Sequence, residues 1–240
     1  MLGEISKDVK AIGGLLRYFT SSSITVEAAE KEIKFSTPNL SSRWELNFVK
    51  NAEKDVFEKM LSEMDEEDTF YDIGANIGFY TCFFSEKASK SYSFEPNKHA
   101  AQILRENIEE NSLENVEVIE AAASDRNTSI KLSKAPGTSV FGTAQIKDSE
   151  EGEIEARKVD GLFEEGKVEL PDMVKIDVEG HEIEVLKGME EVIATASPVI
   201  YVESNENHEA LRETLEKYGY ELQRLNRRID GNIFYRAEPA

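Results

Sequence analysis

Residues 72–78 read Asp-Ile-Gly-Ala-Asn-Ile-Gly and close a short apolar run that begins at Thr69. A short apolar run that ends in a glycine-rich turn is typical of a buried strand that leads into a helix. Glycine at Gly74 and Gly78 lets the backbone turn tightly and lets a ligand approach the main chain closely. The segment therefore predicts a strand, a turn and a helix, either with a ligand over the turn or as a plain β-to-α connection.

The same alternation of short strands and helices continues along the chain, which predicts a mostly parallel sheet with helices on both faces. Ligands on such sheets bind beyond the carboxyl ends of the strands, so residues that follow a strand are candidates for the site. We expect further strands at Ser91–Phe94, Val116–Ala121, Met173–Val178 and Val199–Glu203, an edge strand at Ser129–Leu132, and a terminal hairpin of Tyr220–Leu225 and Asn232–Arg236. We expect helices near Val56–Met64, Ile77–Ala88, Lys98–Asn111, Glu182–Ala194 and His208–Tyr218.

Residues 1–51 differ in pattern from residues 52–240, and we expect the former to be an accessory region and the latter the main domain. Apolar residues from Leu2 to Phe19 recur at three- and four-residue spacing, which predicts an amphipathic helix. That helix would pack on the core or form a homodimer contact. Two alternating runs, Ile24–Phe35 and Trp44–Val49, predict a β-hairpin or β-arm.

The composition argues against several classes of function. The 240 residues include 48 Asp and Glu against 28 Lys and Arg, a net charge of −20, which disfavours a nucleic-acid partner. A single cysteine, Cys82, excludes a disulfide framework, and three distant histidines argue against a His-rich metal site. No apolar run has the length of a membrane span and no secretory leader is visible, so we expect a cytoplasmic protein without a membrane partner.

Acidic residues accompany the first two predicted strands. Asp72 stands at the entrance of the glycine turn, where it would repel a phosphate but suits a ligand that carries an ammonium or sulfonium charge. The turn also differs from the dinucleotide pattern G-x-G-x-x-G, because Asn76 occupies the place of the second glycine. Glu95 follows Asp72 by 23 residues and ends the second strand, where a carboxylate can accept both hydroxyl protons of a ribose.

Charged residues also follow the third, fourth and fifth strands. Asp125 either accepts a hydrogen bond from an adenine amino group or caps a turn. The fourth strand runs into Lys175-Ile-Asp-Val-Glu-Gly-His-Glu, so Asp177, Glu179 and His181 lie at the end of a buried strand. Glu203 ends the fifth strand, which is adjacent to the fourth if the sheet has the usual order.

Three motifs together resemble a known family. The turn over residues 72–78, the tripeptide Phe94-Glu95-Pro96 and the segment Lys175–Gly188 resemble the FkbM-type methyltransferases, class I enzymes that use S-adenosylmethionine. The lead-in Val159-Asp160 also resembles that family, and the resemblance covers roughly residues 52–236.

The resemblance implies a Rossmann-like α/β fold whose sheet has seven strands, one of them an antiparallel strand from the terminal hairpin. It implies transfer of a methyl group from S-adenosylmethionine to a hydroxyl of a sugar, a glycan or a small natural product. The methionine end of the cofactor would lie over the glycine turn and its ribose on Glu95. The expected cofactor-binding residues, from the strand ends and the resemblance, are Asp72, Gly74, Ala75, Asn76, Gly78, Glu95, Pro96, Ala123, Asp125 and Asp177.

Methyl transfer from a sulfonium is an in-line displacement, and an alcohol attacks readily only when a base accepts its proton. The catalytic candidates are Asp177, Glu179 and His181, of which the imidazole titrates nearest neutrality. Each has an alternative: His181 as an exposed residue in a first helical turn, Asp177 as a partner of the methionine amino group, Glu179 as a loop brace. There are two other hypotheses. In one, a divalent metal held by Asp177 and Glu203 acidifies the hydroxyl. In the other, the domain binds the cofactor without catalysis.

Overall fold

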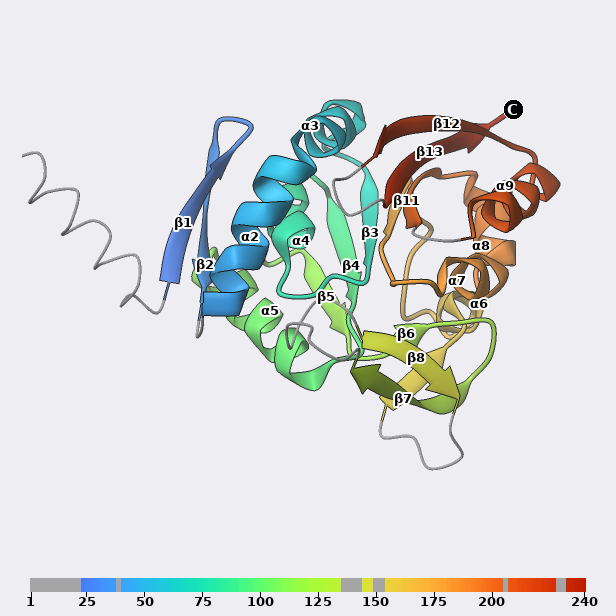
Figure 1. The fold of residues 1–240 in the computed structure, drawn as a ribbon, viewed down its shortest axis with the longest axis horizontal. Helices are drawn as coiled ribbons and strands as arrows, with labels where there is room; N and C mark the ends of the chain where they lie inside the picture. Colours follow the sequence, from blue (N-terminus) through green and yellow to red (C-terminus); the bar gives the residue numbers. More distant parts are fainter. Residues whose placement is uncertain (1–22, 38–39, 135–143, 149–153, 205–206, 228–231) are drawn as a thin grey trace, which may run out of the picture.

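The structure, a computed structural model, has a central sheet between two layers of helices (Figure 1). The expected amphipathic helix over Leu2–Phe19 lies outside the residues that the structure describes. Within the described residues, no helix is long and apolar enough to cross a membrane. The described residues are 23–37, 40–134, 144–148, 154–204, 207–227 and 232–240.

The central sheet contains seven strands, in the order β12 (Tyr220–Arg227), β13 (Ile233–Pro239), β11 (Val199–Ser204), β10 (Met173–Ile176), β3 (Thr69–Ile73), β4 (Lys90–Phe94) and β5 (Val116–Ile119). β13 pairs antiparallel with both β11 and β12, and all other neighbours pair parallel. Six strands therefore share one direction. The expected Rossmann-like sheet, with its antiparallel strand taken from the terminal hairpin, is confirmed.

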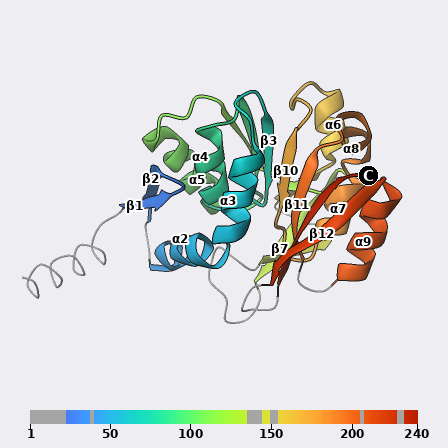
Figure 2. The same ribbon diagram turned by 90° about the horizontal axis from the view of Figure 1, so that it is seen from above.

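Helices cover both faces of this sheet (Figure 2). Successive side chains of a strand point to opposite faces, and β3 divides accordingly. Phe70 packs in the core beneath α2 to α5, and Tyr71 packs in the core beneath α6 to α9. The helices are α2 (Leu40–Ala52), α3 (Lys54–Glu63), α4 (Phe79–Ser85), α5 (Lys98–Glu110), α6 (Val159–Glu164), α7 (Glu182–Lys187), α8 (Glu190–Ala196) and α9 (His208–Lys217).

The N-terminal hairpin is shorter than expected. β1 (Ser23–Ala28) and β2 (Lys31–Ser36) pair antiparallel, so both strands come from the first alternating run. The expectation of a strand at Trp44–Val49 was wrong, because these residues lie in α2. The buried residues Arg43 and Leu46 are three positions apart, which is the spacing of one helix face.

A second, smaller sheet lies beyond the end of β5 (Figure 1). The strand expected at Val116–Ala121 ends at Ile119, and the chain then continues as the first strand of the small sheet. The edge strand expected at Ser129–Leu132 is confirmed within β7, but it pairs in the small sheet and not at the edge of the large one. The strand order is β6 (Ala122–Ala123), β9 (Ile154–Arg157), β7 (Thr128–Lys134) and β8 (Ala144–Asp148).

The helix expected over Glu182–Ala194 is broken at Gly188 into α7 and α8. The Gly188 carbonyl accepts the N–H of Asp160 at 2.9 Å, and the Asp160 carboxylate accepts the N–H of Val192 in the first turn of α8 at 3.0 Å. A Cβ atom on Gly188 would lie 1.9 Å from the carbonyl oxygen of Ser124. Gly188 is therefore the point where the paired helices touch the end of β6.

The substitution Gly188→Ala should destabilise the protein, because its methyl group would overlap the Ser124 carbonyl and force the backbone to shift. We expect the free energy of unfolding to fall by about 1–3 kcal/mol in urea denaturation. Gly161→Ala is the matched control, since a Cβ there would meet only the Cβ of Lys158 at 3.9 Å. A control that loses as much stability as Gly188→Ala would contradict the argument from close approach.

Candidate active site

The glycine turn after β3 is fixed by backbone contacts to two neighbouring strands. The N–H groups of Gly74 and Ala75 both donate to the Phe94 carbonyl at the end of β4, each at 3.0 Å. Gly74 and Gly78 have φ angles of 85° and 90°, which strain any residue with a side chain. A Cβ on Gly74 would lie 1.9 Å from the carbonyl oxygen of Asp177. Gly74 therefore lets the ends of β3 and β10 come together.

The Asp72 carboxylate is buried beneath this turn, with 1% of the residue exposed. Its Oδ2 atom accepts the N–H of Thr81 at 3.0 Å and the hydroxyl of Thr81 at 2.7 Å. Its Oδ1 atom lies 3.6 Å from Nζ of Lys175. Asp72 thus stabilises the first turn of α4 and carries a charge that Lys175 balances. Its contact with a cationic ligand stays a prediction.

The ammonium group of Lys175 is the buried cation of the site. Nζ lies 3.4 Å from Oδ2 of Asp177 and 4.6 Å from the centre of the Tyr80 ring, whose hydroxyl donates to the Glu53 carboxylate at 2.8 Å. Burial opposes the charge, but the carboxylates of Asp177 and Asp72 outweigh it and raise the pKa of Lys175. The ammonium group therefore stays charged and holds both carboxylates.

Glu95 links the end of β4 to the glycine turn. Its Oε2 atom accepts the N–H of Asn76 and its Oε1 atom accepts the N–H of Asn97, both at 2.8 Å. Pro96 lies between Glu95 and Asn97 and has no N–H to offer. Burial raises the pKa of Glu95 to about 7, although the two backbone N–H groups act to lower it. The carboxylate predicted to bind a ribose is thus in direct contact with the turn.

A second group of polar residues lies where β6 meets the loop after β10. Oγ of Ser124 and Nε2 of His181 are 3.0 Å apart and share a hydrogen bond, and Nδ1 of His181 lies 3.6 Å from the Glu184 carboxylate. His181 occupies the N-cap position of α7 with 15% of its side chain exposed, so the alternative of an exposed first-turn residue is wrong. Asp125 follows Ser124 and pairs with the Arg126 guanidinium at 3.3 Å.

A known protein family matches the part of the chain that carries most of these residues. The family model described as the methyltransferase FkbM domain matches residues 72–222, which begin at the glycine turn and include His181. The chain belongs to the FkbM methyltransferase family.

Individual relatives agree with this membership. The hexuronic acid methyltransferase AglP of Haloferax volcanii is 31% identical over 216 residues, which are 87% of this chain and 87% of the relative. A solved FkbM methyltransferase from Methylobacillus flagellatus has a TM-score of 0.52 at 17% identity, over 72% of this chain and 44% of that one. M. jannaschii TYW2, solved in complex with AdoMet, also has a TM-score of 0.52 at 17% identity, over 92% and 88% of the two chains. The two structural matches bear on the fold alone.

In this FkbM methyltransferase the loop after β10 carries backbone strain. Glu179 has a φ angle of 52° and Gly180 has one of 97°. The N–H of Gly180 donates to the buried Glu182 carboxylate at 2.7 Å, while burial raises the pKa of Glu182. A non-glycine residue in the left-handed region costs on the order of 1–3 kcal/mol and is frequent at functional loops. The strained loop joins Asp177 to His181.

Two other expected site residues, Ala123 and Glu203, make contacts with the rest of the fold. Ala123 is buried in β6 and packs in the core on the α6–α9 side. The Glu203 carboxylate accepts a hydrogen bond from the side-chain amide of Asn232 at 2.6 Å. In the part of the chain that the structure describes, no group of three or more His, Cys, Asp or Glu side chains could hold a metal ion. Asp177, the other metal ligand of that hypothesis, has the Lys175 ammonium as a neighbouring cation.

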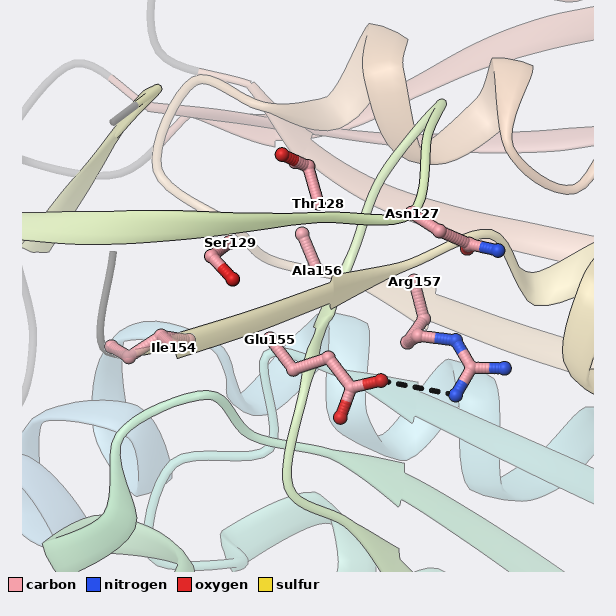
Figure 3. Close-up of a pocket in the computed structure, with 7 residues that line it drawn as sticks. All are labelled: Asn127, Thr128, Ser129, Ile154, Glu155, Ala156 and Arg157. Carbon is pink, nitrogen blue, oxygen red and sulfur yellow. Dashed lines mark hydrogen bonds and ion pairs between the residues drawn. The ribbon is translucent and has the colours of Figure 1, made fainter. Parts of the chain in front are cut away.

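A shallow hollow of about 560 Å³ lies on the small sheet (Figure 3). The Arg157 guanidinium in its lining pairs with Glu155 at 3.0 Å and with Glu165 at 2.6 Å. The carbonyl of Arg157, one of the lining residues, accepts the N–H of Ser124 at 2.9 Å. Its lining consists of Asn127, Thr128, Ser129, Ile154, Glu155, Ala156 and Arg157.

Lys175 and Ser124 are site residues that the sequence alone did not indicate. Lys175 interrupts an apolar strand two residues before Asp177, and a lysine at such a position needs a buried anion, which is a signal that could have identified it. Ser124 gives no comparable signal, because its contact with His181 depends on how the small sheet packs.

The raised pKa of Glu95 predicts a pH-dependent contribution to stability. The folded protein binds this proton more tightly than the unfolded chain, whose carboxyl has an ordinary pKa of 4.5, so the free energy of unfolding should fall as pH rises from 4.5 to about 7. The loss should be at most about 3 kcal/mol. Denaturant unfolding at several pH values should give a shallower decline for Glu95→Gln than for the wild type. The exposed Glu114→Gln should keep the wild-type decline, and an unchanged decline in Glu95→Gln would refute the assignment.

Proposed function

We propose that this FkbM methyltransferase transfers a methyl group from S-adenosylmethionine to a hydroxyl group of a sugar, a glycan or a small natural product. The observation that carries the proposal is the buried carboxylate of Glu95, 2.8 Å from the N–H of Asn76 in the glycine turn. A carboxylate after the second strand, set against a glycine turn after the first, is the arrangement that binds the ribose of an adenosine cofactor. Membership of a methyltransferase family supports the choice of methyl donor.

The residues around the turn fit this cofactor. Each oxygen of Glu95 accepts one backbone N–H, which leaves each with a further lone pair for a ribose hydroxyl. When bound, S-adenosylmethionine would supply a methyl group that an acceptor oxygen can attack, with S-adenosylhomocysteine as the leaving group. We propose that Asp72 and Asp177 would supply the negative charge for the sulfonium centre. We propose that the cofactor is held by Gly74, Ala75, Asn76, Gly78, Glu95, Pro96, Ala123 and Asp125.

Asp177 has a geometry that suits orientation of a bound group. Its side chain is 28% exposed, whereas that of Lys175 is 3% exposed, so the carboxylate reaches the surface with a buried cation behind it. The ammonium balances the charge of Asp177 and fixes the position of Oδ2. Such a carboxylate can accept a hydrogen bond from the acceptor hydroxyl or from an ammonium group of the cofactor.

His181 is the general base in this proposal. Ser124 at Nε2 and Glu184 at Nδ1 hold the imidazole ring between them. The negative charge of Glu184 would stabilise the imidazolium that forms when a hydroxyl proton is taken up. The proton would reach Nε2 through the Ser124 hydroxyl or after that hydroxyl is displaced. Glu179, in the strained loop between Asp177 and His181 in the sequence, would brace the loop or bind the substrate.

An acidic sugar is the first acceptor to test. The relative AglP is a hexuronic acid methyltransferase and aligns with 87% of this chain. The hollow on the small sheet offers the amide of Asn127, the hydroxyls of Thr128 and Ser129, and the guanidinium of Arg157. Small-molecule sites are concave and carry a small number of polar groups that fix the orientation of the ligand. The Arg157 guanidinium already pairs with Glu155 and Glu165, so the choice of an acidic sugar rests on the relative and not on an unbalanced cation in the hollow.

Incubation of the protein with S-adenosylmethionine that carries a labelled methyl group should transfer label to glycans containing hexuronic acid. Neutral hexose glycans and small alcohols are the comparison set. Mild alkali then distinguishes the acceptor oxygens, because a methyl ether on a hydroxyl survives and a methyl ester on the carboxylate is hydrolysed. Binding of S-adenosylhomocysteine without transfer to any acceptor would favour a non-catalytic cofactor-binding domain. Lack of cofactor binding in calorimetry would refute the proposal.

The substitutions Asp177→Asn and His181→Ala should lower turnover in folded protein and change cofactor affinity less. Loss of a general base typically costs about 10²–10⁴-fold in rate. The rising limb of the pH–rate profile should disappear in His181→Ala and persist in Asp177→Asn. A rising limb that survives in His181→Ala would mean that another group is the general base. Activity that persists in the presence of a chelator would exclude a metal-bound base.

A further inference from the structure

Asn107 joins two segments that lie far apart in the sequence. It is on α5 with 0% of its surface exposed. Its Oδ1 atom accepts the N–H of Ser36, the last residue of β2, at 2.6 Å. Its Nδ2 atom donates to the carbonyl of Ile77, inside the glycine turn, at 2.7 Å. One buried side chain therefore connects the N-terminal hairpin to the turn expected to hold the cofactor.

The Ile77 carbonyl needs this donor because of how α4 begins. α4 begins at Phe79 with Gly78 as its N-cap, so the Ile77 carbonyl precedes the helix and receives no helical N–H, and the N–H of Thr81 is one of the donors that a helix start leaves without an intrahelical acceptor. Here the N–H of Thr81 donates to Oδ2 of Asp72 at 3.0 Å. Asp72 thus accepts a donor at the start of α4, and Asn107 supplies a donor to the carbonyl just before it. The amide accepts from Ser36 and donates to Ile77 at the same time, whereas a carboxylate only accepts and an alkyl group does neither.

Apolar contacts enclose the same turn from the hairpin and α5. The Phe35 ring on β2 stacks on Phe79, the first residue of α4, with 6.2 Å between ring centroids and 12° between ring planes. Leu104 on α5 occupies the space beside Gly78, where a Cβ would lie 2.3 Å from Leu104 Cδ1. The hairpin and α5 therefore enclose the end of the turn that leads into α4.

We infer that Asn107 is a positioning residue through which the N-terminal hairpin, residues 23–36, fixes the cofactor turn. The hairpin then serves the cofactor site, beyond any part it has in choosing the acceptor. This inference rests on the proposed function for the identity of the cofactor. The effect of Asn107 on the geometry of the turn should also be present in the protein without cofactor.

Asn111, the C-cap of α5 four residues after Asn107, offers a matched control. Its side chain accepts the N–H of Lys34 at 3.0 Å and donates to the Lys34 carbonyl at 2.8 Å. A further hydrogen bond from its amide goes to the carbonyl of Asn107 at 2.7 Å. Asn111 thus docks the same hairpin by the same chemistry, through residues that are not part of the turn.

The first measurement is amide hydrogen exchange in the cofactor-free protein. Asn107→Asp keeps the acceptor for Ser36 and replaces the donor to Ile77, so exchange of the amides of residues 74–78 should accelerate about tenfold or more. Asn111→Ala should leave these amides at the wild-type rate while the hairpin amides accelerate. Ser36→Pro removes the N–H at the other end of the bridge and should act like Asn107→Asp, with Ser36→Ala as its control. Turn amides that exchange alike in both asparagine variants would overturn the inference.

The second measurement separates this inference from the proposed function. Asn107→Asp should weaken S-adenosylhomocysteine binding and raise KM for S-adenosylmethionine about tenfold, with kcat and the acceptor KM within about twofold of wild type. Asn111→Ala should lower the melting temperature without this change. If the wild type binds no cofactor while the exchange rates differ as expected, the proposed function fails and the link between hairpin and turn stands. Equal cofactor affinities in the two variants would overturn the inference.

Discussion

The ion pair between Lys175 and Asp72 is the interaction on which the rest of the site depends. The two residues face each other across the β3–β10 pair at the centre of the sheet, and neither has more than 2% of its surface exposed. Removal of one partner from a buried pair leaves an uncompensated charge that costs about 3–5 kcal/mol. Thr81 extends the pair to the start of α4, and Asp177 extends it to the surface.

The direction of the strands gathers the other polar groups at the same edge. β3, β4 and β10 run parallel, so the glycine turn, Glu95 and Asp177 all follow the carboxyl ends of adjacent strands. Aromatic side chains fill the core beneath that edge, where the Phe57 ring meets those of Phe79 and Phe83 at 5.4 Å and 5.3 Å between centroids. The polar groups therefore rest on a tightly packed apolar base, which limits their movement.

The sequence predicted those parts of the fold whose signals are local. The strand over Thr69–Ile73 was predicted because its residues form a short apolar run, and the glycine turn that follows marks where the run ends. α2 was missed because its apolar residues alternate at Trp44, Leu46 and Phe48, a pattern that fits a strand equally well. The small sheet was missed because β6 has only two residues and its partner in β9 comes more than thirty residues later. In the site, Glu95 was predicted from its place after a strand, whereas the partners of Lys175 and Ser124 depend on register and long-range packing.

The facing positions of Lys175 and Asp72 also select one alignment of the two halves of the sheet. A shift of β10 by one residue along β3 would bring Val174 or Ile176 opposite Asp72 and turn the lysine into the opposite apolar layer. The carboxylate would then be buried without a cation, so the misaligned pairing would be strongly unfavourable. Lys175 and Asp72 are 103 residues apart, and contacts of such separation form late because closing a long loop costs entropy. The same charges that organise the site therefore favour the native strand register over a misaligned one.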